Sequence, residues 1–405
     1  MPETRRLPLW AGRTTALIGI VLVALSLRQA VAAISPILSE IDVDIPLSSI
    51  AIGVLGMLPP ILFAASGFIA PPIARRLGLE QAVVLSIVLM VIGHLGRAIA
   101  PNYGVLVLAS VVTLLGMGLG NVLLPPVVRR YFPDRIAVIT STYVGILALS
   151  TAAPALVATP LADSVGWRFS LGIWALTGVV AVIPWLVLLA RQRAAAVSDV
   201  VESVAPTLVG QLWRSRVALA ITLSFSASTV SLYACLAWLP QILEETAGST
   251  QSEAGVLLAL FSFVGLPGGI IAPLVVARVK NVAWILIAGV ALFVIGFGGL
   301  ALAPATATVL WVVCLGVGPI MFPVCLVLIN SRTRTHEGAI ALSGFVQGIG
   351  YTLGAFGPLG LGLLHDLTSG WVVPLLVLMA ATLVSILGAL ALAEPRYVED
   401  ELARA

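Results

Sequence analysis

Arg28 is the residue of this sequence best placed to do chemistry, because it lies inside an apolar stretch that runs from Thr14 to Leu38. A cation at the centre of a membrane helix costs about 2.5–3.5 kcal/mol on insertion scales, so it normally faces a protein interior or a water-filled path. No acidic residue lies inside a comparably apolar stretch. The position predicts a charge-assisted contact with an anionic or strongly polar ligand. The alternative is a structural arginine bonded to backbone carbonyls and to Ser, Asn or Gln side chains.

Three polar side chains recur at every fourth residue of a late apolar stretch. Ser343, Gln347 and Tyr351 have the spacing that places residues on one face of a helix. A polar stripe facing lipid would be costly, so we expect it to face protein or a cavity. Asn121 and Tyr143 are further cavity candidates in other apolar stretches. Hydrogen bonding between helices is the alternative interpretation for all five residues.

His94 and Arg97 form a second polar pair, near the end of another apolar stretch. They are three residues apart and therefore lie on one face of a helix. His94 is able to titrate near neutral pH and so to couple protons. The simpler interpretation is that Arg97 reaches the membrane surface and pairs with Asp42 or Asp44.

The elements that must position these residues are membrane-spanning helices. The chain has 405 residues, of which 60% are hydrophobic and 10% are charged, whereas a soluble domain has about 25% charged residues. A helix needs about 20 apolar residues to cross a bilayer. Twelve stretches qualify, which predicts an all-α polytopic membrane protein: 14–39, 49–74, 81–100, 103–127, 137–161, 169–190, 216–243, 253–277, 281–303, 306–330, 338–364 and 371–393.

Basic residues orient these helices. Eighteen of the 21 Lys and Arg residues fall in segments on one side, and the loops of the other side hold only Arg168. Because positive charge stays inside, both termini are predicted to be cytoplasmic. A longer polar loop separates the spans six and six. It predicts an N-terminal six-helix bundle at 1–190, a cytoplasmic linker at 191–215 and a C-terminal six-helix bundle at 216–405.

The two halves resemble each other at an offset near 202. Ile69-Ala70-Pro71 matches Ile271-Ala272-Pro273, and three further ordered matches accompany it. Parallel halves of this kind are related by an axis along the membrane normal, with the binding site between them. The alignment of Pro36 with Pro240 sets Tyr233 opposite Gln29. The charge of Arg28 is then on one half only, and Tyr233 is able to stack on a planar ligand from the other.

Longer motifs carry a resemblance to a known family. They are Leu27-Arg28-Gln29-Ala30, 120–125, Trp238–Leu243 and Leu342–Tyr351. They resemble the major facilitator superfamily, and within it the cyanate and nitroimidazole permease branch. The resemblance implies two six-helix pseudo-repeats that transport by alternating access, with the first helix of each half lining the cavity. The family's loop between the second and third helices has an Asp that is missing from residues 67–76, so the gating salt bridge attributed to it is in doubt here.

No catalytic constellation, phosphate-binding loop or Cys/His cluster occurs in the sequence. We therefore expect no enzyme activity, cofactor, metal ion or nucleic-acid partner. We expect a monomeric, multi-pass transporter in the lipid bilayer of the plasma (inner) membrane, coupled to protons, if at all, through His94 and Arg97 or through the substrate.

The expected substrate is a small organic or inorganic anion, or a small planar polar solute that is cyanate-like or nitroimidazole-like. The alternative is a multidrug or lipid-like amphiphile exporter with a mainly apolar cavity. The candidate substrate-binding residues are Arg28, Gln29, Tyr233, Gln347, Tyr351, Asn121, Tyr143 and Ser343.

Overall fold

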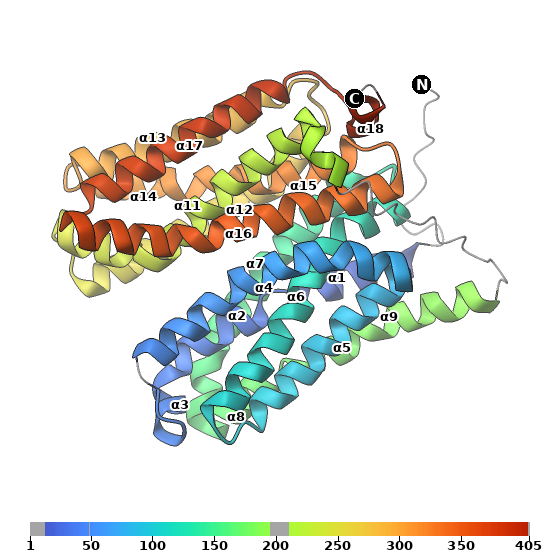
Figure 1. Ribbon diagram of the computed structural model, residues 1–405. Coiled ribbons are helices and arrows are strands. Elements are labelled where there is room, and N and C mark those ends of the chain that lie inside the picture. Colours follow the sequence, from blue (N-terminus) through green and yellow to red (C-terminus); the bar gives the residue numbers. More distant parts are fainter. Residues whose placement is uncertain (1–12, 48, 195–209, 404–405) are drawn as a thin grey trace. The chain divides into compact units, whose positions relative to one another are not determined.

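The computed structural model describes residues 13–47, 49–194 and 210–403, which form helices joined by short loops (Figure 1). No β-strand occurs among these residues. Lipid offers no hydrogen-bond partners to the backbone, so a chain that crosses a membrane satisfies its own peptide groups within helices. Twelve helical segments of the described chain are long and apolar enough to cross a membrane. The predicted all-α class and the number of spans are confirmed.

The chain divides into two compact units. Unit 1 comprises Met1–Pro206 and Thr335–Gly344, and unit 2 comprises Thr207–Arg334 and Phe345–Ala405. Most of the predicted linker, residues 195–209, lies outside the described residues. The division into bundles at 1–190 and 216–405 therefore stays a prediction.

Unit 1 contains the first six spans, and its first span is made of several short helices. The helices are α1 (Thr14–Ser26), α2 (Gln29–Ile34), the 3-10 turn η1 (Ser35–Ile37), α3 (Leu38–Asp44), α4 (Ser49–Leu77), α5 (Leu79–Ala98), α6 (Tyr103–Tyr131), α7 (Ile136–Val165), α8 (Trp167–Gly172) and α9 (Ala175–Ala194).

Unit 2 contains the last six spans and a short C-terminal helix. The helices are η2 (Leu212–Arg214), α11 (Arg216–Ala247), α12 (Gln251–Val276), α13 (Ala283–Leu302), α14 (Thr308–Val317), η3 (Gly318–Ile320), α15 (Met321–Ser331), α16 (His336–Thr368), α17 (Val372–Ala391) and α18 (Val398–Leu402). The first residues of α16, up to Gly344, group with unit 1.

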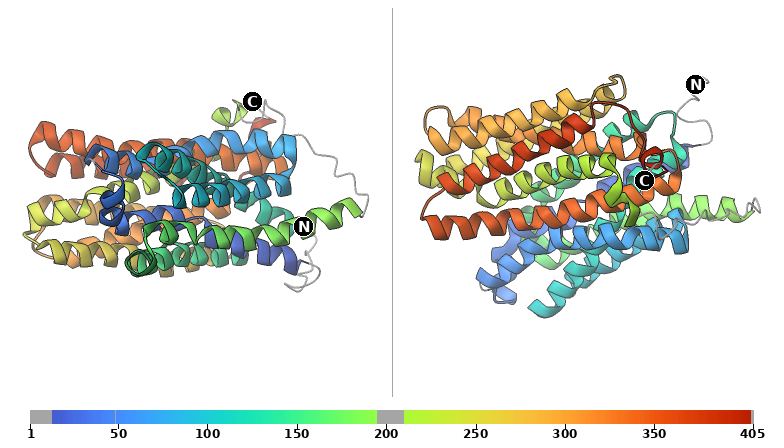
Figure 2. Two further views of the ribbon diagram at one scale, coloured as in Figure 1. Left: turned by 90° about the horizontal axis from the view of Figure 1, so that it is seen from below. Right: turned by 45° about the horizontal axis from the view of Figure 1, so that its top comes forward.

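Glycines let neighbouring helices of unit 1 approach closely. A Cβ atom added to Gly116 of α6 would lie 2.6 Å from the backbone oxygen of Ser86 and 2.8 Å from the backbone nitrogen of Met90, both in α5. Small residues at such crossings allow close backbone packing in membrane bundles. The α5 and α6 helices accordingly lie side by side, as do α13 and α17 in unit 2 (Figures 1 and 2).

An acid from the start of α5 lies near the ends of the helices that carry the basic residues. The Glu80 side chain is 3% exposed, and its Oε1 atom lies 3.1 Å from Nε of Arg130 and accepts a hydrogen bond of 2.6 Å from the Tyr131 hydroxyl. Residues 67–76, the C-terminal part of α4, contain no acid, but Glu80 of α5 supplies a carboxylate next to Arg130 and Tyr131.

Candidate functional site

The first membrane span is interrupted at the residue that carries its charge. The α1 helix ends at Ser26 and α2 begins at Gln29, so Arg28 lies between two helices. The Arg28 backbone N–H donates to Oγ of Ser150 in α7 at 3.0 Å, and its carbonyl accepts from the Ala32 N–H at 3.1 Å. Breaks of this kind are tolerated where protein satisfies the freed backbone groups, and in transporters they often line binding sites.

The Arg28 side chain is partly exposed and lies over an aromatic ring. Its guanidinium carbon lies 5.3 Å from the ring centroid of Phe63 in α4, within the range of cation–π attraction. Phe63 itself is buried, at 1% exposure. A cation–π contact uses the positive charge of the guanidinium and none of its N–H donors. The ring of Phe63 therefore helps to hold the cation beside the break.

Gln29 is fixed within unit 1. Its side chain is 1% exposed, and its Oε1 atom accepts a hydrogen bond of 2.7 Å from the Thr177 hydroxyl in α9. The same hydroxyl lies 3.4 Å from that of Ser26 at the end of α1. The residues on both sides of the break, Ser26 and Gln29, thus contact the same hydroxyl of α9. A direct contact between Gln29 and substrate stays a prediction.

Asn121 and Tyr143 are both buried in unit 1, at 7% and 2% exposure. Gly120, which precedes Asn121, faces the break directly: a Cβ atom there would lie 2.6 Å from Cδ2 of Leu27. The Nδ2 atom of Asn121 has no hydrogen-bond partner within the described part of the chain. Asn121 therefore directly follows the residue at which α6 contacts the break in the first span.

The polar stripe of α16 is divided between the two units. Ser343, in the part that groups with unit 1, donates a hydrogen bond of 2.8 Å to the Val122 carbonyl. In unit 2 the ring of Tyr351 lies 6.4 Å from that of Tyr233 and packs edge-on against Phe225 at 5.4 Å. The structure thus brings Tyr233 and Tyr351 together.

Gln347, between them on the stripe, is 1% exposed. The stripe is buried in protein over its length, as its spacing predicted. Whether substrate touches Gln347, Tyr351 or Ser343 stays a prediction.

The pairing expected for Arg97 is wrong. Arg97 is 1% exposed, and its Nη1 donates to the Ala30 carbonyl at 3.2 Å. Asp42 accepts from the backbone N–H of Leu47 instead. Because Ala30 belongs to the short helix after the break, an acceptor inside unit 1 is within reach of Arg97, and the side chain turns inward.

Asp44 pairs with Arg168 and also accepts a hydrogen bond of 3.0 Å from the indole N–H of Trp167. The Arg168 hydrogen bond, together with that of Trp167, holds the pKa of the Asp44 carboxyl below its ordinary value. The carboxylate of Asp44 is therefore paired with Arg168 and Trp167 at the start of α8, and not with Arg97.

His94 is also buried, at 2% exposure, and its Nδ1 lies 3.2 Å from the Leu171 carbonyl. A carbonyl only accepts, so this contact requires the hydrogen on Nδ1. The role of His94 in coupling stays a prediction.

Sequence reasoning missed the residues that hold the break. Ser150 and Thr177 lie 122 and 148 positions from their partners Arg28 and Gln29, and a single sequence carries no signal for such a distant pair. Phe63 was one of many apolar residues with nothing to distinguish it.

Twelve spans, with a cation at the break of the first one, are the features of a polytopic membrane protein. The chain belongs to the Major Facilitator Superfamily, whose profile matches residues 17–355. The family and the relatives below are transporters rather than enzymes, and the chain is a transporter of this superfamily.

The similarity to individual proteins extends over most of the chain. The 2-nitroimidazole transporter of Escherichia coli (strain K12) is 31% identical over 93% of this chain and 95% of its own length. The cyanate transport protein CynX of the same organism is 26% identical over 88% and 91%. The structure of the proton:xylose symporter XylE superposes with a TM-score of 0.76 over 96% of this chain and 98% of that one, at 15% identity, which supports the fold alone.

Proposed function

We propose that this protein is a secondary active transporter that moves a small anion or a small planar polar solute by alternating access. The observation that carries the proposal is Arg28, a partly exposed cation in the break of the first span, over the ring of Phe63. A guanidinium presents a planar fork of donors that suits carboxylates and similar anions. Arg28 is thus the electrostatic anchor of the substrate.

The other candidate residues act by shape and hydrogen bonding. Tyr233 and Tyr351 offer aromatic faces for a planar ligand. Gln347 and Asn121 supply amide groups that donate and accept, and Ser343 and Tyr143 supply hydroxyls. None of them carries a charge, so binding is electrostatically one-sided. This favours anions over the cationic compounds that a buried carboxylate would select.

The names of the relatives support the same substrate class. One transports 2-nitroimidazole and another transports cyanate. Both compounds are small and polar, and cyanate is an anion. The membrane is the plasma (inner) membrane, with both termini cytoplasmic by the distribution of basic residues. The transporter works as a monomer, and protons, if they are used, pass through His94 or move with the substrate.

Binding to the purified protein tests the proposal. A ligand that binds the folded state raises the unfolding temperature by mass action, so cyanate, 2-nitroimidazole and small carboxylates are titrated against thermal unfolding in detergent. Loss of a charge-assisted hydrogen bond costs about 1.5–3 kcal/mol, so Arg28→Ala is expected to weaken binding about 10- to 150-fold. Arg28→Lys is expected to recover only part of it, because an ammonium lacks the planar fork.

The matched control is Lys280→Ala, which removes an exposed positive charge from the loop before α13. It is expected to bind like the unaltered protein. Unchanged affinity in a well-folded Arg28→Ala variant would contradict the assignment. Stabilisation by amphiphilic drugs that is equal with and without Arg28 would favour the exporter alternative.

A further inference from the structure

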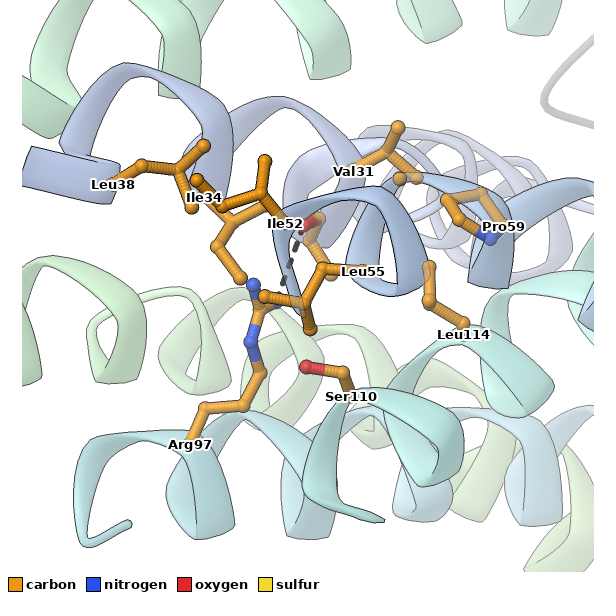
Figure 3. Close-up of a pocket in the computed structure, with 11 residues that line it drawn as sticks. Val31, Ile34, Leu38, Ile52, Leu55, Pro59, Arg97, Ser110 and Leu114 are labelled. Atoms are coloured by element: carbon orange, nitrogen blue, oxygen red, sulfur yellow. Dashed lines mark hydrogen bonds between the residues drawn. The ribbon is translucent and has the colours of Figure 1, made fainter. Parts of the chain in front are cut away.

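Unit 1 contains a cavity next to the break of the first span. Its volume is about 160 Å³, and it lies between α2, α4, α5 and α6. A single buried water needs about 10–15 Å³ of such space, so the cavity has room for a small molecule. Most of its lining is apolar, including Ile34, Leu55 and Leu114 (Figure 3).

Two polar side chains interrupt this apolar lining. They are Arg97 from α5 and Ser110 from α6, which are 1% and 3% exposed. In Figure 3 the Ser110 hydroxyl points toward the Arg97 side chain. Neither Nε of Arg97 nor the Ser110 hydroxyl has a hydrogen-bond partner among the described residues.

The charge of Arg97 is not compensated by an acid. Its protein contact in the described chain is the Ala30 carbonyl, and the lining of the cavity contains no Asp or Glu. A buried cation without a counter-ion is strongly unfavourable, whereas a paired one is tolerated. The cavity therefore offers an anion both a positive charge and a hydroxyl donor within a mostly apolar lining.

We propose that this cavity is a second anion-binding site, separate from Arg28, for a small monovalent oxyanion of formate or nitrate size. The Arg97 guanidinium supplies the charge and Ser110 donates to the anion. One cation matches one negative charge, and a divalent ion would leave a charge uncompensated in an apolar surrounding. The anion also lies beside Ala30, two residues after Arg28, so it contacts the segment that carries the proposed substrate anchor.

Formate is the probe for this site, used with the full-length protein in detergent. Sodium formate replaces sodium gluconate at constant ionic strength, and bound radiolabelled formate and the unfolding temperature are measured. Ser110→Leu fills the cavity and is expected to abolish the formate binding that remains in the Arg28→Ala background, where the proposed substrate site is removed. Ser110→Ala removes one donor to a charged ligand and is expected to weaken it by about tenfold. Arg97→Gln is expected to abolish it as well.

Two comparisons separate this site from Arg28. Arg28→Ala is expected to retain the formate binding that Ser110→Leu removes. Ser66→Ala, which alters a buried serine of α4 that does not line the cavity, is expected to change nothing. In the Arg28→Ala variant, displacement of formate by cyanate would mean that this site binds the same class of anion as the proposed substrate. If cyanate does not displace formate, the site binds a simple anion from solution instead.

Formate binding that persists in the Arg28→Ala, Ser110→Leu double variant, or that disappears in Arg28→Ala alone, would overturn the second site. In the latter case the proposed role of Arg28 would stand. If Arg97→Gln fails to fold, the two Ser110 variants decide the question, because neither removes the hydrogen bond to Ala30.

Discussion

The Ser150 hydroxyl holds the backbone of Arg28, and its removal is expected to loosen the break. Ser150 is fully buried and accepts the Arg28 N–H at 3.0 Å. A buried donor left without a partner costs about 1–3 kcal/mol. Ser150→Ala is therefore expected to lower the unfolding temperature and to weaken substrate binding, as measured by thermal unfolding and ligand titration.

Thr142→Ala is the matched control for this change. Thr142 is on the same helix, α7, but is exposed, and its hydroxyl donates to the Val138 carbonyl one turn earlier. It is expected to leave binding unaltered. Equal effects of the two substitutions would mean that the hydroxyl of Ser150 does not position Arg28.

An ion pair at the start of α1 makes stability depend on pH. The Arg13 guanidinium donates to Asp134 at 2.6 and 3.3 Å, and this hydrogen bond holds the pKa of the Asp134 carboxyl below its ordinary value. A lowered pKa in the folded state contributes stability above the unfolded value of about 3.9, and that contribution is lost as the pH falls through the folded value.

Asp134→Asn is accordingly expected to be less stable than the unaltered protein at pH 6, with the difference shrinking below about pH 4. Unfolding temperatures of both proteins between pH 3 and pH 7 measure this. A difference that stays constant to the acid end would mean that the charge of Asp134 is not what Arg13 stabilises.

A single charge in an apolar stretch was enough to find Arg28, but not to find what surrounds it. The burial of Arg97 illustrates the limit. Counting residues from the end of α5 gives its depth, and depth predicted an outward side chain. Its direction depends on the Ala30 carbonyl and on the cavity beside it. Both exist only after three other helices pack, which no local pattern encodes.

Close packing between α5 and α6 depends on Gly116. The added methyl group of Gly116→Ala would meet backbone atoms of Ser86 and Met90 at 2.6 and 2.8 Å, and the helices must separate to accept it. Overpacking of this kind costs about 1–3 kcal/mol. Thermal unfolding is expected to record a lower midpoint.

Gly360→Ala in α16 is the counterpart, since no atom lies within 4 Å of a Cβ at that position. There the higher helix propensity of Ala, worth about 1 kcal/mol, is expected to leave the protein equally or more stable. A lower unfolding midpoint for Gly116→Ala and an equal or higher one for Gly360→Ala would separate the effect of packing from that of helix propensity. A lower midpoint for both variants would contradict this interpretation.

The existence of the helices was predictable, because about 20 apolar residues in a row have few other folds in a membrane. The positions at which these helices are interrupted could be predicted only in part. The tenth span changes to a 3-10 turn at Gly318–Ile320, where Pro319 is a local cause. The first span breaks at Arg28 with no Pro or Gly beside it, and the α4 helix continues through Pro59 and Pro60. A tertiary contact, the hydrogen bond from the Arg28 N–H to Ser150, accompanies the break in the first span.

Equivalent helices have equivalent neighbours in the two units, as an internal repeat requires. In unit 1, α5 contacts α6 and α9, and α9 contacts α1; in unit 2, α13 contacts α14 and α17, and α17 contacts α11. The matched segments 115–118 and 315–318 each carry two glycines. Gly116 and Gly118 approach α5 and α4 in unit 1, and Gly316 and Gly318 approach α12 and α13 in unit 2. The repeat therefore extends from sequence matches to packing within each unit.

The orientation of the whole chain can be tested on the loops at the two ends of α13. Lys280 and Ala305 are exposed in these loops, and because α13 crosses the membrane once, they lie on opposite sides. The distribution of basic residues predicts that Lys280 is cytoplasmic. A membrane-impermeant maleimide added to intact cells is expected to label Ala305→Cys but not Lys280→Cys, and both after permeabilisation. Labelling of the three native cysteines is minor, since all are buried. The reverse pattern would invert the topology, and labelling of both variants in intact cells would mean that α13 does not cross the membrane.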